Sequence, residues 1–186
     1  MQNEESKKRE IPKYSLRNVV DHDHDFLVEL HNDPAVLKNI TNPDPITLES
    51  HMAWWSRIQS STTEERLIFC IDGIRAGFVK LYRMDRANFN CELGADLHKN
   101  FRGYGHAKHM WNLMLERCFR IHNMHRVSLF VADYNTIAVH LYEKLGFKVE
   151  GKLNESLLRD GIFYDQTAMY MLAKDFESYE EHLPNS

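Results

Sequence analysis

The sequence has few cysteines, and their spacing excludes two common uses of that residue. Its 186 residues contain only three, Cys70, Cys91 and Cys118, which lie far apart along the chain. No two of them form a C-x-x-C pair, the arrangement typical of structural zinc sites and redox dithiols. We therefore expect all three to be small core residues of a protein that folds in a reducing compartment.

The sequence also lacks long apolar runs and stripes of basic residues. Apolar stretches such as residues 67–71 are far shorter than the roughly 20 residues that a membrane-spanning helix needs. No basic segment followed by an apolar one resembles a secretory signal after Met1. The formal net charge of -4 disfavours binding to nucleic acid. These absences favour a cytoplasmic protein that acts on a small molecule or another protein, without a membrane or nucleic-acid partner.

Internal repeats and low-complexity linkers are absent as well, which favours one domain. Residues 1–13 are polar and rich in charge, and we interpret them as a flexible leader. We interpret residues 175–186 as a tail of the same kind, so a single domain is predicted over residues 14–174. With 43% hydrophobic residues, a chain of this size buries roughly 70% of its unfolded surface, which suffices for one core.

Hydropathy patterns predict strands that first pair as hairpins and later alternate with helices. Apolar residues recur every three or four positions over residues 105–123, which predicts the clearest helix. Asp72-Gly73 and Arg159-Asp160-Gly161 are turn signals between alternating strand patterns. The predicted strands are residues 14–18, 66–72, 75–84, 88–97, 125–131, 147–158 and 163–172, and the other predicted helices are residues 21–30, 47–58 and 135–145. This order predicts an α+β fold with a mixed central sheet.

A glycine-containing loop precedes the clearest predicted helix. Gly103 and Gly105 allow backbone conformations that other residues resist, and they let the chain approach a ligand closely. The N-terminus of the following helix directs its amide groups and the positive end of its dipole to the same place. Arg102 and Lys99 add positive charge, so the segment suits a pyrophosphate; a tight turn without a ligand is the alternative. The spacing matches neither the G-x-G-x-x-G of dinucleotide folds nor a Walker A loop.

The loop and a second segment together resemble the GCN5-related N-acetyltransferases, the GNAT family. The acyl-CoA motif of that family is Arg/Gln, two residues, Gly, one residue and Gly/Ala, which residues 102–107 match as Arg-Gly-Tyr-Gly-His-Ala. Residues 92–97, Glu-Leu-Gly-Ala-Asp-Leu, resemble the strand before that loop, and residues 135–147 resemble the second family motif. The acetyl-CoA-binding residues that the resemblance implies are Leu97, Arg102, Gly103, Tyr104, Gly105, His106, Ala107, Asn135 and Tyr142.

The resemblance covers residues 14–172 and implies the GNAT fold. That fold has a mixed, mostly antiparallel sheet of about seven strands, splayed where acetyl-CoA binds and flanked by helices. It also implies direct acetyl transfer to an amine within a ternary complex, which needs positioning but neither a metal ion nor a covalent intermediate.

Individual residues receive roles from the same resemblance. Tyr142 would lie beside the CoA sulfur and donate a proton to it, while Glu92 would act as the general base through water. Core packing of Tyr142 and a merely exposed strand position of Glu92 are the alternatives. The main-chain amide of Leu97 would polarise the thioester carbonyl. Asn135 would cap its helix, bind the CoA arm, or do both.

Several histidines lie close together in the sequence without predicting a metal site. His22 and His24 alternate with aspartates, and His106 and His109 are three residues apart. A catalytic zinc needs three protein ligands, and no third ligand is indicated for either pair. We interpret these histidines as solvated residues at helix ends.

The resemblance leaves the amine acceptor open between several classes. Residues 31–39 and 46–55 are similar to segments of family members that acetylate amino groups of nucleotide-linked sugars. This similarity implies His51, Trp54 and Trp55 as acceptor-binding residues, because aromatic rings can stack on a sugar or base. Packing of a Trp against the sheet is the alternative for at least one of them.

A second acceptor class rests on the C-terminal half of the sequence. That half is also similar to spermidine acetyltransferases and to ribosomal-protein N-terminal acetyltransferases. A polyamine would require several carboxylates in one pocket, which Glu29, Asp33, Asp44 and Glu49 are candidates to supply; solvated helix faces explain the same residues. A CoA-binding module without catalysis and a homodimer also remain open.

Overall fold

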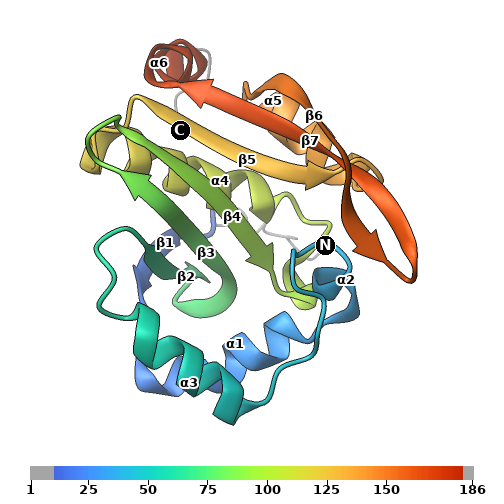
Figure 1. Cartoon of the computed structure of the whole chain (residues 1–186). Helices are drawn as coiled ribbons and strands as arrows, with labels where there is room; N and C mark the ends of the chain where they lie inside the picture. The colour runs from blue at the N-terminus through green and yellow to red at the C-terminus, as the bar shows by residue number, and fades with distance from the viewer. Residues whose placement is uncertain (1–10, 182–186) are drawn as a thin grey trace, which may run out of the picture.

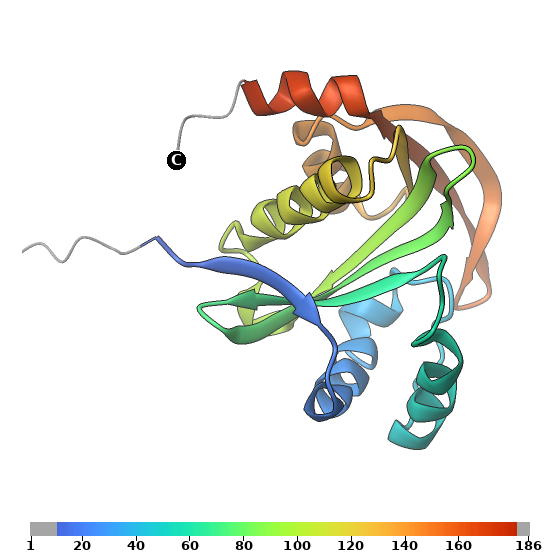
Figure 2. The same ribbon diagram turned by 90° about the vertical axis from the view of Figure 1, so that its left-hand side faces the viewer.

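In the computed structural model, residues 11–181 are described, and they form one sheet with helices on both faces (Figures 1 and 2). The predicted leader, residues 1–13, lies almost entirely outside the described residues. The elements in chain order are β1 (Tyr14–Asn18), η1 (Asp21–Asp23), α1 (His24–His31), α2 (Pro34–Leu37), α3 (Leu48–Ile58), β2 (Glu65–Ile71), β3 (Ile74–Asp85), β4 (Asn90–Leu97), η2 (Lys99–Phe101), α4 (His106–Glu116), η3 (Arg117–Ile121), β5 (Arg126–Ala132), α5 (Thr136–Lys144), β6 (Lys148–Arg159), β7 (Ile162–Leu172) and α6 (Ala173–Glu181).

The sheet has seven strands in the order β1-β2-β3-β4-β5-β7-β6. Five of the neighbouring pairs are antiparallel, and the pair of β4 with β5 is parallel. The predicted mixed, mostly antiparallel sheet is therefore confirmed. Both predicted turns also form: Asp72 and Gly73 have φ values of 51° and 79°, and Asp160 and Gly161 have 49° and 78°. Two successive positive φ angles match the twist of a tight hairpin.

The sheet opens between β4 and β5. These strands pair only from Asn90 opposite Arg126 to Glu92 opposite Ser128. Beyond that point both strands continue, to Leu97 and Ala132, without pairing to each other. Figure 1 shows them side by side at their starts and divergent towards their ends. The described residues thus contain a wedge-shaped gap in the middle of the sheet, as the resemblance implied.

Strand alternation divides the interior into two cores. Leu67 and Phe69 of β2 point to the face covered by α4, where Met110 and Met114 complete the larger core. Ile68 and its neighbours on the other face pack under α1 in a smaller core. Figure 2 shows α1 and α3 on the side of the sheet opposite α4. Because α1 and α3 lie over the first strands, the same face of β4 and β5 is left for a cavity.

The cysteines behave as the sequence predicts, since Cys70, Cys91 and Cys118 are all buried and unpaired by disulfides. Cys91 and Cys118 place their sulfur atoms 3.9 Å apart inside the larger core. Within the described residues, no helix is long and apolar enough to cross a membrane.

The end of the chain corrects the prediction of a flexible tail from residue 175. Residues 173–181 form the helix α6 instead. Its Phe176 is only 2% exposed and stacks on Phe119, with 5.1 Å between the ring centroids. The core therefore extends past residue 174, where the sequence places the domain end. The tail is mostly polar, and a single buried aromatic ring is too weak a periodic signal to predict a helix.

Candidate active site

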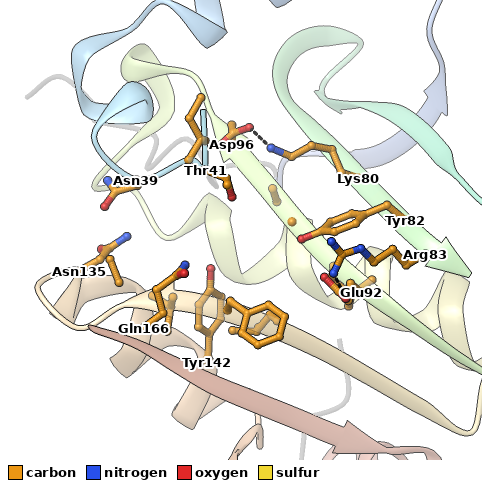
Figure 3. A pocket seen from close by; sticks show the side chains of 18 of the residues that line it. Asn39, Thr41, Lys80, Tyr82, Arg83, Glu92, Asp96, Asn135, Tyr142 and Gln166 are labelled. Atoms are coloured by element: carbon orange, nitrogen blue, oxygen red, sulfur yellow. Dashed lines mark hydrogen bonds and ion pairs between the residues drawn. The ribbon is translucent and has the colours of Figure 1, made fainter. Parts of the chain in front are cut away.

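A cavity of about 500 Å³ lies where β4 and β5 diverge. Its walls come from strands β2 to β7, from α5 with the preceding Asn135, and from residues 39–41 of the loop after α2. Figure 3 shows polar side chains around it from β3, β4, β7, α5 and the loop after α2. We call it the larger cavity, to distinguish it from an adjoining cavity of about 380 Å³ that is described below.

The β4 wall of the larger cavity is built by strand alternation. Glu92, Gly94 and Asp96 share one face of β4. The missing side chain of Gly94 leaves room for Lys80 and Tyr82, which would lie 3.2 and 3.6 Å from an added Cβ. Lys80 bonds Asp96 with 2.6 Å between nitrogen and oxygen, as the dashed line in Figure 3 shows. Arg83 donates to Oε1 of Glu92 at 2.7 Å. Each carboxylate is thus already paired with a cation, which orients it.

Tyr142 enters the same cavity from α5 on the other side of the gap. Its ring packs edge-on against Trp111 with 4.7 Å between centroids, and its hydroxyl points into the cavity (Figure 3). Burial, with smaller contributions from Asp96 and Tyr82, raises the pKa of Tyr142 well above its ordinary value. The phenol therefore keeps its proton at neutral pH and is a hydrogen-bond donor.

Main-chain amides also face the gap. His98 donates its amide to the carbonyl of Ala76, so Leu97 opposite Gly77 is a pair without mutual hydrogen bonds. The N–H of Leu97, and that of Ala95 two residues earlier, consequently point away from β3 and towards the gap. Pairing with β5 ends at Glu92, so these two donors are positioned for a ligand in the gap.

The loop between β4 and α4 has the open backbone that a phosphate group needs. Gly103 and Gly105 have φ values of 85° and 84°, in the left-handed region that favours glycine. An added Cβ at either position would meet no described atom within 4 Å, so the loop surface is open. Gly105 precedes α4, whose first turn has no side-chain cap. Uncapped amides at a helix N-terminus are a common binding site for anions.

Arg102 has a different role in the structure from the free cation that the sequence suggested. Its Nε donates to the carbonyl of Leu97 at 2.8 Å, and its guanidinium lies 3.2 Å from the carboxylate of Asp33. Burial alone would raise the pKa of Asp33, but hydrogen bonds from Ala35 and Arg102 outweigh it and lower that pKa. Arg102 therefore fixes the loop to the end of β4 and to α2.

A second cavity of about 380 Å³, which we call the apolar cavity, lies under α1 and α3. His51 and Trp54 of α3 line it, whereas Trp55 does not. Trp55 instead packs edge-on against His24, with 5.3 Å between ring centroids. His24 Nδ1 and His51 Nε2 are 3.0 Å apart and both rings are buried, so His24 is not the solvated residue that the sequence predicted. Burial, followed by repulsion from His24 and His31, lowers the pKa of His51 to about 4.

The structure brings together some of the residues singled out in the sequence and separates others. Glu92, Tyr142 and Asn135 line the larger cavity, and the Asn135 side chain also accepts the amide of Ala138 as an N-cap. Trp55 lies outside both cavities. The carboxylates suggested for a polyamine line neither cavity: Glu29, Asp33, Asp44 and Glu49.

Most residues of the larger cavity received no role from the sequence, among them the ionisable side chains Arg66, Lys80, Tyr82, Arg83 and Asp96. Arg66 is opposite Lys80 across the β2–β3 pair, and its guanidinium lies over the rings of Trp54 and Tyr82. The period-2 alternation of these strands was the available signal, because Asp96 shares a face with Glu92. Which residue of a neighbouring strand stands opposite depends on register, which alternation alone does not define.

The sequence and the fold of this chain are similar to those of known proteins. Residues 14–148 match the acetyltransferase (GNAT) domain family. Spermidine N(1)-acetyltransferase from Vibrio cholerae is 33% identical over 105 residues, which cover 56% of this chain and 61% of that enzyme. The L-amino acid N-acetyltransferase AaaT from Escherichia coli is 27% identical over 159 residues, covering 84% of this chain and 94% of that enzyme.

Similarity in three dimensions extends over more of the chain. The crystal structure of spermidine N-acetyltransferase from Vibrio cholerae in complex with CoA and spermine superposes with a TM-score of 0.84. The two proteins are 26% identical, and the superposition covers 88% of this chain and 98% of that one. Since the family match spans most of the chain and the splayed sheet agrees with it, the chain belongs to the family of GNAT acetyltransferase domains.

Proposed function

We propose that the protein transfers an acetyl group from acetyl-CoA to a primary amine of a small molecule. The observation that carries this proposal is the gap between β4 and β5, which has main-chain donors on one side and Tyr142 on the other. The amine nitrogen forms a bond to the acetyl carbon while the carbon–sulfur bond breaks. The nitrogen loses a proton, and the sulfur gains one.

We assign acetyl-CoA binding to the loop between β4 and α4 and to the gap between β4 and β5. The residues suit the ligand: the open backbone around Gly103 and Gly105 and the uncapped start of α4 provide donors for a pyrophosphate. The amides of Ala95 and Leu97 face the gap, where an amide-containing arm would pass. In this proposal the Leu97 amide also hydrogen-bonds the thioester oxygen, on which negative charge develops during attack.

Proton transfer is assigned to Tyr142 and Glu92. The buried phenol of Tyr142 is a hydrogen-bond donor for the departing thiolate, and burial raises the pKa of a thiol in the same way as that of the phenol. Glu92 accepts the proton of the amine through water. Arg83 occupies Oε1 of this carboxylate, and no described side chain donates to Oε2.

The names of the relatives narrow the choice of candidate acceptor amines. None of the relatives compared above is named for an amino sugar, so the nucleotide-linked sugar predicted from the sequence gains no support from them. The relative from Vibrio cholerae, matched by sequence and by structure, is named for spermidine, which makes a polyamine the second candidate within the same activity. One is named for amino acids.

The test is thiol release from acetyl-CoA by the purified full-length chain with a panel of primary amines. We expect amine-dependent release, with a matching acetylated product detected by mass spectrometry. Release that no amine raises above the background rate would contradict the proposal and would support a CoA-binding module without catalysis.

A further inference from the structure

The apolar cavity adjoins the larger cavity. Ile40, Lys80 and Asp96 line both. A molecule whose reacting end lies in the larger cavity can therefore extend its other end into the apolar cavity. This makes the second cavity a candidate for the part of the acceptor that does not react.

The lining of the apolar cavity determines what it can hold. Leu27, Leu30 and Phe78 form its floor and are 4%, 2% and 9% exposed. Ile46 and Trp54 add apolar side walls. Its polar lining residues other than Lys80 and Asp96 are His31, Asn42, Ser50 and His51. Such a surface gains free energy by removing hydrocarbon from water.

Charge in the apolar cavity argues against a polycation. Among the described residues that line it, Asp96 is the only carboxylate, and Lys80 already pairs with it at 2.6 Å. His51 also lines this cavity and is neutral at pH 7, because burial and repulsion from His24 and His31 lower its pKa to about 4. A second ammonium group would lose its hydration here without gaining a free counter-charge.

We propose that the apolar cavity is the acceptor subsite and that it takes the hydrocarbon part, aliphatic or aromatic, of a primary monoamine. This rests on the proposed acetyl transfer and narrows its substrate class. The amine nitrogen lies on the larger-cavity side of the junction formed by Lys80 and Asp96, directed at the gap between β4 and β5. The hydrocarbon part extends towards Leu30 and Phe78.

The first experiment is a chain-length series with the full-length protein. The rate constant kcat/KM for acetylation is measured for ethylamine, propylamine, butylamine, pentylamine and hexylamine, with spermidine for comparison. Each buried methylene should raise kcat/KM by up to about fourfold until the cavity is filled. Spermidine should react more slowly than hexylamine.

A matched pair of variants assigns the effect to this cavity. Ile46 lines it, and hydrogen bonds between Asn32 and the main chain of Ile46 hold its position. Ile46→Ser should lower kcat/KM for hexylamine by about tenfold and flatten the chain-length series. Leu48, two residues later, is 45% exposed and lines neither cavity. Leu48→Ser should leave the series unchanged.

A binding measurement separates failure of this subsite from failure of the enzymatic proposal. Calorimetric titration of hexylamine into the protein with CoA should give binding that Ile46→Ser weakens and Leu48→Ser does not. If no amine is acetylated but this pattern holds, the subsite stands and the proposed activity fails. If amines are acetylated with no chain-length dependence, or spermidine exceeds hexylamine in kcat/KM, the apolar subsite is wrong.

Discussion

Two tyrosines face the larger cavity from opposite sides, and burial raises the pKa of both. Tyr82 comes from β3 and is held near Glu92, the second cause of its raised pKa. Tyr142 comes from α5, across the gap between β4 and β5. Both phenols therefore remain protonated, but only Tyr142 lies on the side from which the CoA arm would enter in the proposed complex. In the proposed mechanism, position rather than acidity therefore selects Tyr142 as the proton donor.

Replacing Tyr142 by phenylalanine should separate catalysis from binding. The ring keeps its edge-on contact with Trp111, and only the proton donor is lost. We expect Tyr142→Phe to lower kcat roughly 100-fold, with the dissociation constant of CoA changed less than about twofold. Tyr179→Phe is the control, since that hydroxyl bonds Asn112 away from both cavities. A wild-type kcat for Tyr142→Phe would exclude the donor role.

His51 should make the protein less stable in weak acid. Its pKa is lowered to about 4 by burial, whereas an unfolded histidine has about 6.5. Between these values the unfolded chain binds more protons, so stability falls as pH decreases. Lowering the pH from 7 to 5 should cost about 2 kcal/mol of unfolding free energy through this group.

Urea denaturation at pH 7 and pH 5 checks this expectation. His51→Gln removes the titrating ring and should reduce the loss between the two pH values by that amount. His125→Gln, at an exposed position, should leave the loss unchanged. An unaltered pH dependence in His51→Gln would show that the His24–His51 pair does not resist protonation.

Among the structural elements, the loop before α4 depends on the left-handed backbone conformation of Gly105. Gly105 and Gly73 both have φ near +80° and open space around the missing Cβ. Alanine at either position should cost about 1 kcal/mol of stability, because the left-handed region is strained for other residues. Gly105→Ala should also weaken CoA binding by about tenfold, the effect of one lost charge-assisted hydrogen bond.

Gly73→Ala is the matched control for that loop, because Gly73 lies in the β2–β3 turn and lines neither cavity. Isothermal titration with CoA compares the two variants directly. Equal CoA affinities for Gly105→Ala, Gly73→Ala and the wild type would remove the loop from the proposed pyrophosphate site.

Elements with a periodic pattern could be predicted from the sequence, whereas those without one could not. The β2–β3 hairpin has alternating residues and the Asp72-Gly73 turn, and it forms as predicted. The helix predicted over residues 105–123 is α-helical to Glu116 and then widens into the π-helical η3. Helix α6 was missed because its stability comes from tertiary contact of Phe176 with Phe119 rather than from local preference.

That contact gives a direct test of α6 as part of the core. Phe176→Ala should lower the free energy of unfolding by about 3–5 kcal/mol, as expected for truncation of a buried aromatic ring. Glu177→Ala, at the exposed neighbouring position, should change it by less than about 0.5 kcal/mol. Urea denaturation monitored by circular dichroism measures both changes. Equal unfolding midpoints for Phe176→Ala and the wild type would contradict the packing of α6 and support the flexible tail predicted from the sequence.

At the scale of the whole molecule, only those site residues that belong to one continuous sequence motif could be predicted. Tyr142 and Glu92 each belong to a family motif, so the sequence could single them out without knowledge of the fold. Lys80 and Asp96 meet only because β3 and β4 pair in one register, with Phe78 opposite Asp96. Register reflects packing of the whole sheet and is not written in either strand.

The net charge of the chain is likewise a poor guide to its cavity. The formal charge is -4, yet the larger cavity has more cationic than anionic side chains. Its cations are Arg66, Lys80 and Arg83, and its carboxylates are Glu92 and Asp96. An acidic chain therefore does not imply an acidic acceptor site, because cavity lining residues act at much shorter range than the rest of the surface.

Long-range contacts also position the loop between α2 and α3, which lines both cavities. Residues 39–46 of this loop contribute Ile40 to both of them. Arg159, at the far end of β6, donates to the carbonyl of Lys38 at 3.0 Å and also to the carbonyl of Ile40. Figure 1 shows the β6–β7 tip beside α2, so the C-terminal hairpin borders the loop that lines both cavities. Arg159 is 9% exposed.

Loss of the hydrogen bonds from Arg159 should weaken binding of the acceptor amine but not binding of CoA. Arg159→Ala removes the side-chain donor to the carbonyl of Ile40 and leaves the carbonyl of Lys38 with the Tyr134 hydroxyl as its remaining side-chain donor. We therefore expect the loop to loosen and KM for the best amine to rise at least about fivefold. CoA affinity should stay within about twofold, because the loop after β4 is anchored separately by Arg102. Lys148→Ala, which breaks an exposed ion pair with Asp175 at the other end of β6, should change neither quantity. If Arg159→Ala weakens CoA and acceptor equally, the hairpin stabilises the whole site instead of its acceptor half.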